Sequence, residues 1–213
     1  MTSTDLIDDL AALDPDRAGV DAHVADRLFR DARSVARFLD RDVPEALVRQ
    51  VHDVVRCGPT ALNTVPLRLL IVRSPEARAR LAAHMAEGNR ERVLAAPLTL
   101  VVAADPGFHR HMDRLTPHAP QLADVFAADA ESAERTAREN AWLQAGYLVV
   151  GLRAAGLGVG PMGGFDKAGV DDDLLAGTGW CSLMVLNVGW PDGEGTHHAR
   201  APRLEWDEVA RTV

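Results

Sequence analysis

Hydrophobic and polar positions along the chain follow two patterns, one typical of helices and one of buried strands. Short apolar runs bounded by proline or serine predict strands, and such runs lie at 67–74, 96–105 and 181–190. Apolar residues spaced three and four positions apart predict helices, and this spacing covers 23–34, 43–57, 75–88 and 131–155, with a short acidic helix at 5–13. Helices outnumber strands and do not alternate strictly with them. The pattern predicts an α+β fold, with a few-stranded mixed or antiparallel sheet surrounded by helices.

The longest helical pattern, residues 131–155, changes character along its length. It opens with polar residues and becomes apolar on nearly every side from Trp142 onward. A helix that is apolar all round is buried, either inside one chain or between subunits. We expect this helix to be central and to lie at a dimer interface, and an internal helix of a monomer is the alternative.

Composition narrows the class of protein. The 213 residues are 47% hydrophobic and carry a formal net charge of -8, so we expect one domain over 25–213 after an extension over 1–24. An acidic chain has no general attraction for nucleic acid or anionic membranes. No secretory signal or membrane-spanning run is recognisable, which predicts a cytoplasmic protein. The two cysteines, Cys57 and Cys181, lie far apart and show no metal-ligand spacing.

A glycine-rich run, GLGVGPMGGFD, occupies residues 156–166 and contains a formal GxGxxG at Gly158, Gly160 and Gly163. A dinucleotide-binding loop needs a strand before the glycines and a helix opening on them. Here a helical pattern precedes them, and Pro161 has no N–H to offer a pyrophosphate. Two other readings stay open: the glycines permit tight turns, or they let the backbone approach a flat ligand.

Three further stretches carry candidate binding residues. ARSVARF (32–38) falls near the end of the first amphipathic helix, GPTALNTVP (58–66) places Asn63 on a loop before a strand, and HHARAPRL (197–204) lies near the C-terminus. Taken with GPMGGFD and in this order, they resemble the FMN-dependent nitroreductase family. The resemblance runs from about Leu28 to the C-terminus and is strongest to the branch that contains malonic semialdehyde reductase.

The resemblance implies an FMN cofactor, whose dianionic phosphate needs local cations in an acidic protein. Arginine and serine side chains would hold the phosphate, Asn63 would meet the polar edge of the ring, and the 161–164 backbone would lie along its face near N5. The residues that the resemblance assigns to FMN are Arg33, Ser34, Arg37, Pro59, Thr60, Asn63, Asn140, Pro161, Met162, Gly163, Gly164, His198, Arg200 and Arg203.

Departures from the family pattern bear on the substrate and on the phosphate. Ala32 and Ala36 stand where many relatives have basic residues, so Arg37 is an open candidate for the phosphate. Val65 replaces a more usual glutamine and makes the expected substrate pocket more apolar. Many relatives have glutamate where this chain has Gly163, and His198 stands in place of a more usual lysine.

The implied activity is an NAD(P)H oxidoreductase with ping-pong kinetics, in which flavin N5 passes hydride to a small acceptor. The acceptor is a malonic semialdehyde-like aldehyde, an enone, a quinone or a nitroaromatic compound. No catalytic side chain is needed, and relatives are typically homodimers with FMN at the interface. The alternatives are a biosynthetic flavin oxidase or dehydrogenase and a flavin-binding protein without turnover.

The stretch 106–130 shows no regular pattern, as is common for binding loops. His109 and His111 form an HxH that lacks a third well-placed ligand, so no metal site is expected. The resemblance places this stretch over the active site. We therefore expect a substrate pocket formed by Val65, His109, Arg110 and His111. The last three residues could bind a carboxylate substrate or the nicotinamide nucleotide, and a solvated loop is the alternative.

Overall fold

The computed structural model describes residues 19–193 and 200–213. The described residues up to Ala32 and the described residues from Arg33 onward form two separate compact units. The first contains α2 (Ala22–Ala25) and one π-helical turn, Asp26–Arg30. The predicted domain boundary between residues 24 and 25 stays a prediction, and the predicted helix 5–13 lies outside the described residues.

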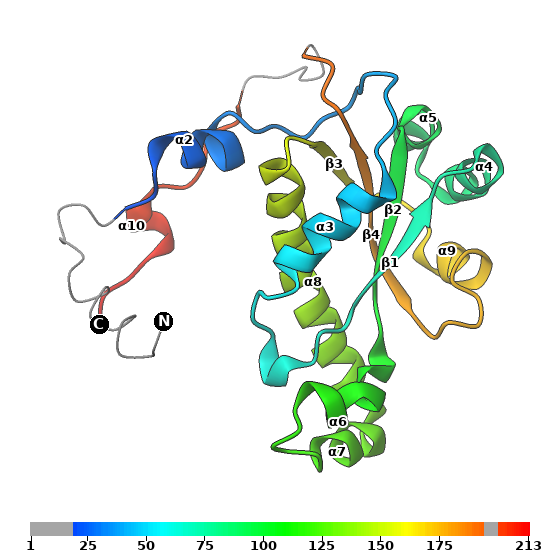
Figure 1. Cartoon of the computed structure of the whole chain (residues 1–213), viewed down its shortest axis with the longest axis vertical. Coiled ribbons are helices and arrows are strands. Elements are labelled where there is room, and N and C mark those ends of the chain that lie inside the picture. Colours follow the sequence, from blue (N-terminus) through cyan, green and yellow to red (C-terminus); the bar gives the residue numbers. More distant parts are fainter. Residues whose placement is uncertain (1–18, 194–199) are drawn as a thin grey trace. The chain divides into compact units, whose positions relative to one another are not determined.

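The second unit is an antiparallel sheet with helices on both faces (Figure 1). Its strands are β1 (Leu67–Val72), β2 (Leu98–Ala104), β3 (Gly158–Met162) and β4 (Cys181–Gly189), in the order β1-β2-β4-β3. Its helices are α3 (Glu45–Val55), α4 (Pro75–His84), α5 (Glu87–Ala95), α6 (Met112–Leu115), α7 (Leu122–Ala128), α8 (Ala130–Ala154), α9 (Lys167–Asp173) and α10 (Trp206–Val209). The predicted α+β class with an antiparallel sheet and one long helix is confirmed.

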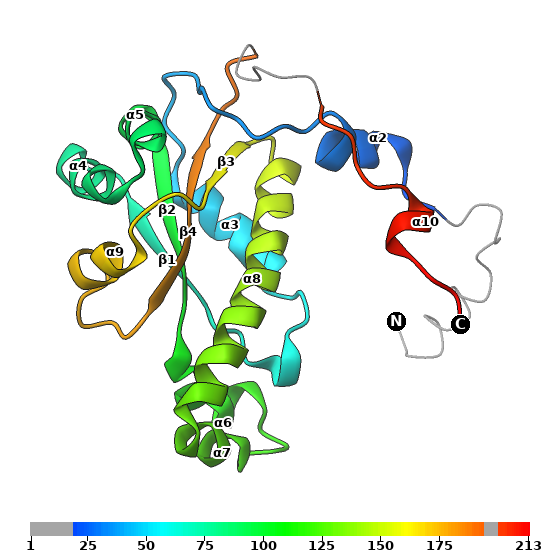
Figure 2. The same cartoon turned by 180° about the vertical axis from the view of Figure 1, so that it is seen from behind.

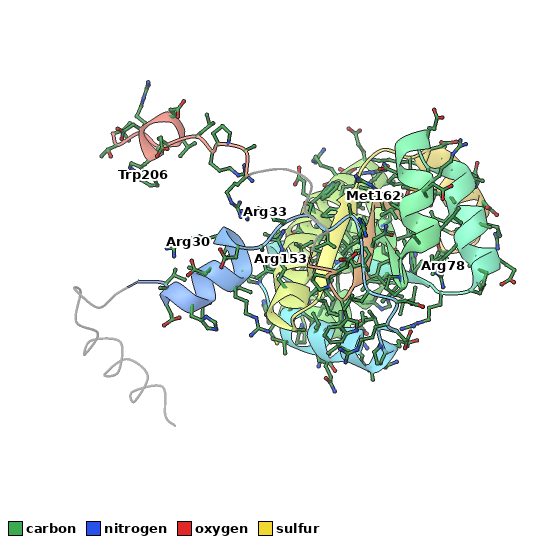
Figure 3. All side chains as sticks on the ribbon, turned by 90° about the horizontal axis from the view of Figure 1, so that it is seen from above. Arg30, Arg33, Arg78, Arg153, Met162 and Trp206 are labelled. Carbon is green, nitrogen blue, oxygen red and sulfur yellow. The ribbon has the colours of Figure 1, made fainter. Side chains whose placement is uncertain are left out.

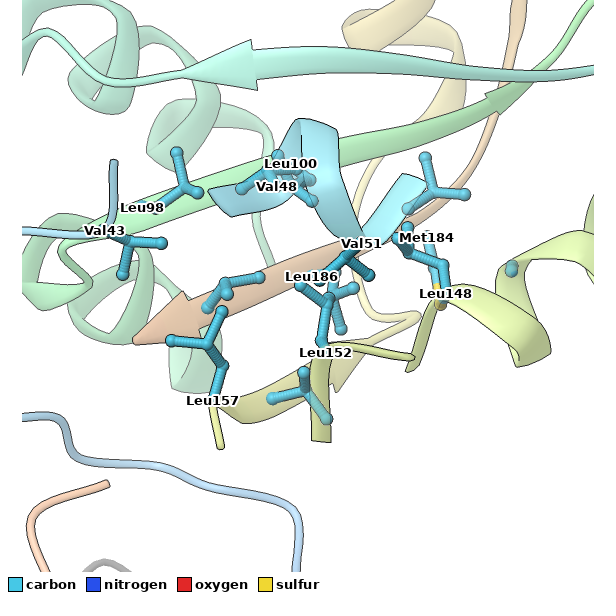
Figure 4. Packing of buried hydrophobic residues seen from close by; sticks show 14 residues of the cluster. Val43, Val48, Val51, Leu98, Leu100, Leu148, Leu152, Leu157, Met184 and Leu186 are labelled. Carbon is cyan, nitrogen blue, oxygen red and sulfur yellow. The ribbon is translucent and has the colours of Figure 1, made fainter. Parts of the chain in front are cut away.

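Helices α3 and α8 cover one face of the sheet, and α4, α5 and α9 lie against the other (Figure 2). Alternate residues of β2 face opposite sides, so Leu100 packs with α3 and α8 while Val101 packs with α4 and α9. Figure 4 shows the first of these cores, in which Leu148 and Leu152 of α8 meet Leu186 of β4. Each such buried side chain contributes roughly 1.5–3 kcal/mol.

Helix α8 owes its position to this packing and its start to a local cap. The Asp129 side chain accepts a hydrogen bond from the Ser132 N–H at 2.9 Å, which satisfies one of the first N–H groups. The helix ends at Ala154, and Gly156, two residues later, has a φ of 83°. Between these ends the helix buries Ala141, Ala145 and Leu148. In the described parts of the chain, no helix has the length and apolar character needed to cross a membrane.

Four predictions of local structure are wrong. Residues 158–162 form strand β3, not a loop. Residues 75–88 contain the end of one helix and the start of another, because Met85 leaves the helical conformation with a ψ of 146°. The 106–128 segment, expected to be irregular, contains a 3-10 turn (Pro106–His111), α6 and α7. The first amphipathic helix ends near Arg30, and Arg33–Phe38 is not helical.

Candidate functional site

The Arg33–Phe38 segment lies beside β3, fixed by backbone hydrogen bonds. Ser34 pairs with Val159 in a parallel bridge, and the Val35 N–H donates to the Val159 carbonyl at 2.8 Å. Further along, Phe38 pairs with Pro191. Arg33 and Ser34 are therefore held at the start of β3 by extended backbone, and the expectation that a helix would present them is wrong.

The glycines of the GxGxxG make this close approach possible. A Cβ on Gly158 would lie 2.7 Å from a methyl carbon of Val35, and one on Gly160 would lie 2.5 Å from the Val35 carbonyl oxygen. A Cβ on Gly163, in contrast, would meet no atom within 4 Å. The first two glycines thus serve packing within the sheet. A helix precedes them and a strand contains them, which does not fit a dinucleotide-binding loop.

A half-buried arginine that sequence reasoning missed lies in the last turn of α8. Burial lowers the pKa of Arg153, and the positive charge of Arg200 lowers this pKa further. Arg33 and Arg153 are both labelled in Figure 3. A guanidinium that is partly removed from water and repelled by a second guanidinium is stabilised when an anion binds to it. The available signal in the sequence was a single arginine inside the apolar stretch YLVVGLRAAGL.

The other predicted phosphate ligands are placed as follows. Arg37 forms an ion pair with Asp192, with 3.3 Å between nitrogen and oxygen. Arg203 is exposed and donates to the carbonyls of Ala201 and Pro202 beside it. His198 lies outside the described residues. A phosphate role for each of these residues stays a prediction.

The 58–66 turn has a strained backbone. Leu62, Asn63 and Val65 have φ values of 52°, 52° and 42°, a left-handed region that non-glycine residues seldom adopt. Each such residue costs about 1–3 kcal/mol, and this strain persists only where surrounding contacts impose it. Residues held in this way are concentrated at binding and active sites.

Hydrogen bonds from distant parts of the chain impose this conformation. The Asn63 Nδ2 donates to the Leu115 carbonyl at 2.7 Å, and the Thr116 hydroxyl donates to the Leu62 carbonyl at 2.8 Å. Tyr147 donates its hydroxyl to the Pro59 carbonyl at 3.1 Å. The 106–128 segment and α8 thus hold the turn between them. The predicted binding residues Pro59, Thr60 and Asn63 all belong to it.

Thr60 and Asn140 bond to the backbone of the same turn. The Val65 N–H donates to the Thr60 hydroxyl at 3.3 Å, and the Ala61 N–H donates to the Asn140 side-chain oxygen at 2.7 Å. Gln144, one helical turn further along α8, accepts from the Leu67 N–H at 3.0 Å. Sequence reasoning did not predict a role for Gln144, because its partner is 77 residues away.

The 161–164 segment spans the end of β3 and the first residues after it. Pro161 and Gly163 are exposed and Met162 is buried. The Gly164 carbonyl accepts from the Ala86 N–H at 3.0 Å and from the Asn89 side chain at 3.2 Å. A cavity of about 430 Å³ borders this segment, with His84, Met85, Arg90, Gly164 and Phe165 in its lining. Sequence reasoning missed Asn89 and Arg90, which the tertiary fold alone brings here.

One predicted pocket residue of the 106–128 segment, Arg110, pairs with a buried carboxylate. The side chain of Asp105 is 3% exposed and accepts from Arg68 at 2.8 Å and from Arg110 at 3.4 Å. Arg68 also donates to the Val65 carbonyl at 3.1 Å. A chain of contacts therefore runs from Arg110 through Asp105 and Arg68 to Val65. His109 and His111 belong to the 3-10 turn that contains Arg110.

An apolar surface accompanies these features. Trp142 and Leu143 of α8 are 47% and 45% exposed in the single chain, and the predicted burial of this helix at a dimer interface stays a prediction. Val54 of α3 is 73% exposed, and α3 packs against α8. Large exposed apolar side chains that gather on neighbouring helices are typical of surfaces that bind another protein.

Known proteins resemble this chain over most of its length. The family model described as "Nitroreductase family" matches residues 29–190. A Streptomyces griseus protein named "Putative NADH dehydrogenase/NAD(P)H nitroreductase" is 45% identical, over 91% of this chain and 98% of that protein.

Solved structures share the fold. A nitroreductase family protein of Streptococcus pneumoniae matches with a TM-score of 0.76 at 24% identity, over 90% of this chain and 98% of that one. A "putative nitroreductase in complex with FMN" of Exiguobacterium sibiricum matches with a TM-score of 0.76 at 18% identity, over 92% and 98% of the two chains. The family match and the close relative together show that this chain belongs to the nitroreductase family of oxidoreductases.

Proposed function

We propose that the protein is an FMN-dependent NAD(P)H oxidoreductase that reduces a small acceptor. The observation that carries this proposal is Arg153, a partly buried guanidinium in the last turn of α8 that lies under the influence of a second cation, Arg200. Such a pair of cations suits the dianionic phosphate of FMN. The names of the S. griseus relative and of the E. sibiricum structure support the same cofactors.

The residues of this chain fit FMN in three places. Arg33, Ser34, Arg153 and Arg200 would hold the phosphate. Asn63 would meet the polar edge of the ring, and the backbone of residues 161–164, where Pro161, Gly163 and Gly164 are exposed residues, would lie beside its face. When bound, FMN supplies a ring atom, N5, that accepts and donates hydride. The chain itself binds and orients the reactants, and it needs no side-chain nucleophile.

We further propose that two copies of the chain assemble into a homodimer that completes the FMN site. The exposed Trp142, Leu143 and Val54 would form the contact surface. Trp142 and Leu143 lie on α8, the helix whose Tyr147 and Asn140 side chains hydrogen-bond to the 58–66 turn. Burying this surface in a second copy would therefore place the partner beside the flavin.

The acceptor we propose first is a small aldehyde that carries a carboxylate, such as malonic semialdehyde. Arg110 is 59% exposed and bonds Asp105 only at 3.4 Å, so it can turn toward an anionic substrate. Val65 offers an apolar contact in the same region. Enones, quinones and nitroaromatic compounds are the other acceptors to test.

The visible spectrum and its response to nicotinamides test this function. The purified protein, incubated with FMN and desalted, is expected to keep a flavin spectrum that NADH or NADPH bleaches without oxygen. A protein that stays yellow with both nicotinamides would instead be a flavin-binding protein or an oxidase that takes electrons from another donor. A protein that binds no FMN would overturn the proposal.

A matched pair of variants tests the phosphate site. Arg153→Met is expected to raise the FMN dissociation constant at least tenfold, because a charged hydrogen bond contributes about 1.5–3 kcal/mol. Arg138→Met is the control, since Arg138 lies on the same helix and pairs with Glu134 at 2.8 Å. The control is expected to bind FMN as the unaltered protein does. Equal losses of FMN affinity in both variants would show that Arg153 does not bind the phosphate.

A further inference from the structure

The geometry points to Asn140 as a positioning residue for the flavin site: we propose that it holds the 58–66 turn in its left-handed conformation and does not touch the flavin. The proposal rests on the FMN-dependent function above. It differs from the expectation that Asn140 contacts the ring or the ribityl chain.

Both polar atoms of the Asn140 side chain are already engaged. Its Oδ1 accepts from the Ala61 N–H at 2.7 Å, and its Nδ2 donates to the Thr136 carbonyl at 2.9 Å. The residue is 7% exposed. An N–H can only donate and a carbonyl can only accept, so these two partners fix which atom of the amide is oxygen and which is nitrogen. A flavin contact would require the amide to give up one of these bonds inside the protein.

The Ala61 bond lies directly before the strained residues. Leu62 and Asn63 follow Ala61 and both have φ near 52°. The Thr116 hydroxyl holds the Leu62 carbonyl from the other side, at 2.8 Å. Because left-handed residues revert to ordinary conformations once their contacts are lost, removing the Asn140 oxygen frees this end of the turn. Asn63, the residue proposed to meet the ring, then loses its fixed place.

A pair of substitutions separates positioning from contact. Asn140→Asp keeps an oxygen facing the Ala61 N–H, and burial favours the protonated acid whose O–H can still donate to Thr136. Asn140→Ala removes the acceptor. Positioning predicts that Asn140→Ala weakens FMN binding about tenfold, as expected for one lost hydrogen bond with an unpaired partner, and that Asn140→Asp restores most of it. A direct contact through Nδ2 predicts that both variants fail equally, which would overturn the proposal.

Amide hydrogen exchange supplies a readout that needs no flavin. In the ligand-free protein, Asn140→Ala is expected to speed exchange at residues 61–65 about tenfold, while Val101 in the central strand β2 stays protected. Asn140→Asp is expected to exchange at these residues as the unaltered protein does. Unchanged exchange at 61–65 in Asn140→Ala would contradict the proposal, even if FMN binding falls.

A second variant covers the case in which Asn140→Ala does not fold. Thr116→Val keeps the shape of the buried side chain and removes only the bond to the Leu62 carbonyl. It is expected to speed exchange at 61–65 and to weaken FMN binding in the same direction, and no change in either would overturn the proposal. If the unaltered protein binds no FMN, the proposed function fails, while the exchange experiment still decides whether Asn140 holds the turn.

Discussion

The carbonyl oxygen of Val35 lies 2.5 Å from the position that a Cβ on Gly160 would occupy. The two residues belong to segments far apart in the sequence that run side by side, since Ser34 pairs with Val159. Backbone cannot yield as a flexible side chain does. Glycine at position 160 is therefore a requirement of the fold, set by the approach of the Arg33–Phe38 segment.

Gly160→Ala is expected to lower the free energy of unfolding by about 2 kcal/mol, because the added methyl forces two backbone segments apart. Gly163→Ala is the control, since a Cβ there meets nothing within 4 Å; it should change stability by less than about 0.5 kcal/mol. Urea unfolding midpoints compare the two. Similar losses of stability in the two variants would mean that the close approach of Val35 to Gly160 does not destabilise an alanine at position 160.

Two buried threonines are predicted to respond in opposite directions. The Thr64 hydroxyl is buried and has no hydrogen-bond partner among the described residues, so Thr64→Val should raise the free energy of unfolding by about 1 kcal/mol. The Thr99 hydroxyl donates to Asn187 at 2.8 Å, and Thr99→Val should cost about 2 kcal/mol. Thermal unfolding of the two single variants distinguishes them. A loss of stability in Thr64→Val would show that its hydroxyl has a partner.

The two arginines beside Asp105 are predicted to differ in their contribution to stability. Arg68→Met removes the closer partner of a carboxylate whose side chain is 3% exposed, and it should destabilise the protein by about 3 kcal/mol. Arg110→Met removes a longer, 59% exposed ion pair and should cost less than about 1 kcal/mol. Denaturant titration checks both values. Arg110→Met thus leaves the fold intact, and a loss of activity toward carboxylate acceptors alone would identify its role in substrate binding.

The thiol of Cys181 is expected to resist alkylation at mildly alkaline pH. Burial raises the pKa of Cys181, and nearby carboxylates reinforce this while Arg138 opposes it. The thiolate is the nucleophile, so labelling by iodoacetamide at about pH 8 should be slower than for a free cysteine, whose pKa is about 8.5. Mass spectrometry of the labelled peptides gives the rate, and the exposed Cys57 serves as the internal comparison.

The same pKa shift has a consequence for stability. A thiol whose pKa is higher in the folded state holds its proton more tightly there, so its contribution is complete below the unfolded pKa. It is lost as pH rises through the folded pKa of Cys181. Cys181→Ala should therefore flatten the loss of stability that begins above the ordinary cysteine pKa of about 8.5. An unchanged slope would contradict this assignment.

The sequence predicted the strands whose pattern is local. Strands β1, β2 and β4 are continuous apolar runs, and their predicted places agree with the structure to within about two residues. Strand β3, with the sequence GVGPM, was missed because glycine and proline disfavour strands. It forms because β4 pairs with it from Gly158 to Met162. The helix predicted over 23–34 rested on the helical spacing of Val24, Leu28 and Phe29, and it wrongly included Arg33 and Ser34, which lie in an extended segment beside β3.

Some residues of the candidate site could likewise be predicted from a local sequence pattern, and others could not. Its motifs were recognisable from the sequence, because Asn63 and the 161–164 segment each belong to a short contiguous pattern. The hydrogen bond between the Ala61 N–H and the Asn140 side chain joins residues 79 positions apart, so no local sequence pattern predicts it. Arg153 was overlooked because its burial and its proximity to Arg200 exist only in the folded chain.

The long reach of these bonds also constrains the order in which the protein folds. The 58–66 turn depends on partners 52, 54 and 79 residues further along the chain. Closing such loops is slow, because the entropy of each loop is lost before its contacts form. A chain that has emerged from the ribosome only as far as β2 lacks every one of these partners. We therefore expect the turn to be among the last elements to acquire its native geometry, so that the proposed FMN would associate with a nearly complete fold and would not guide the earlier steps.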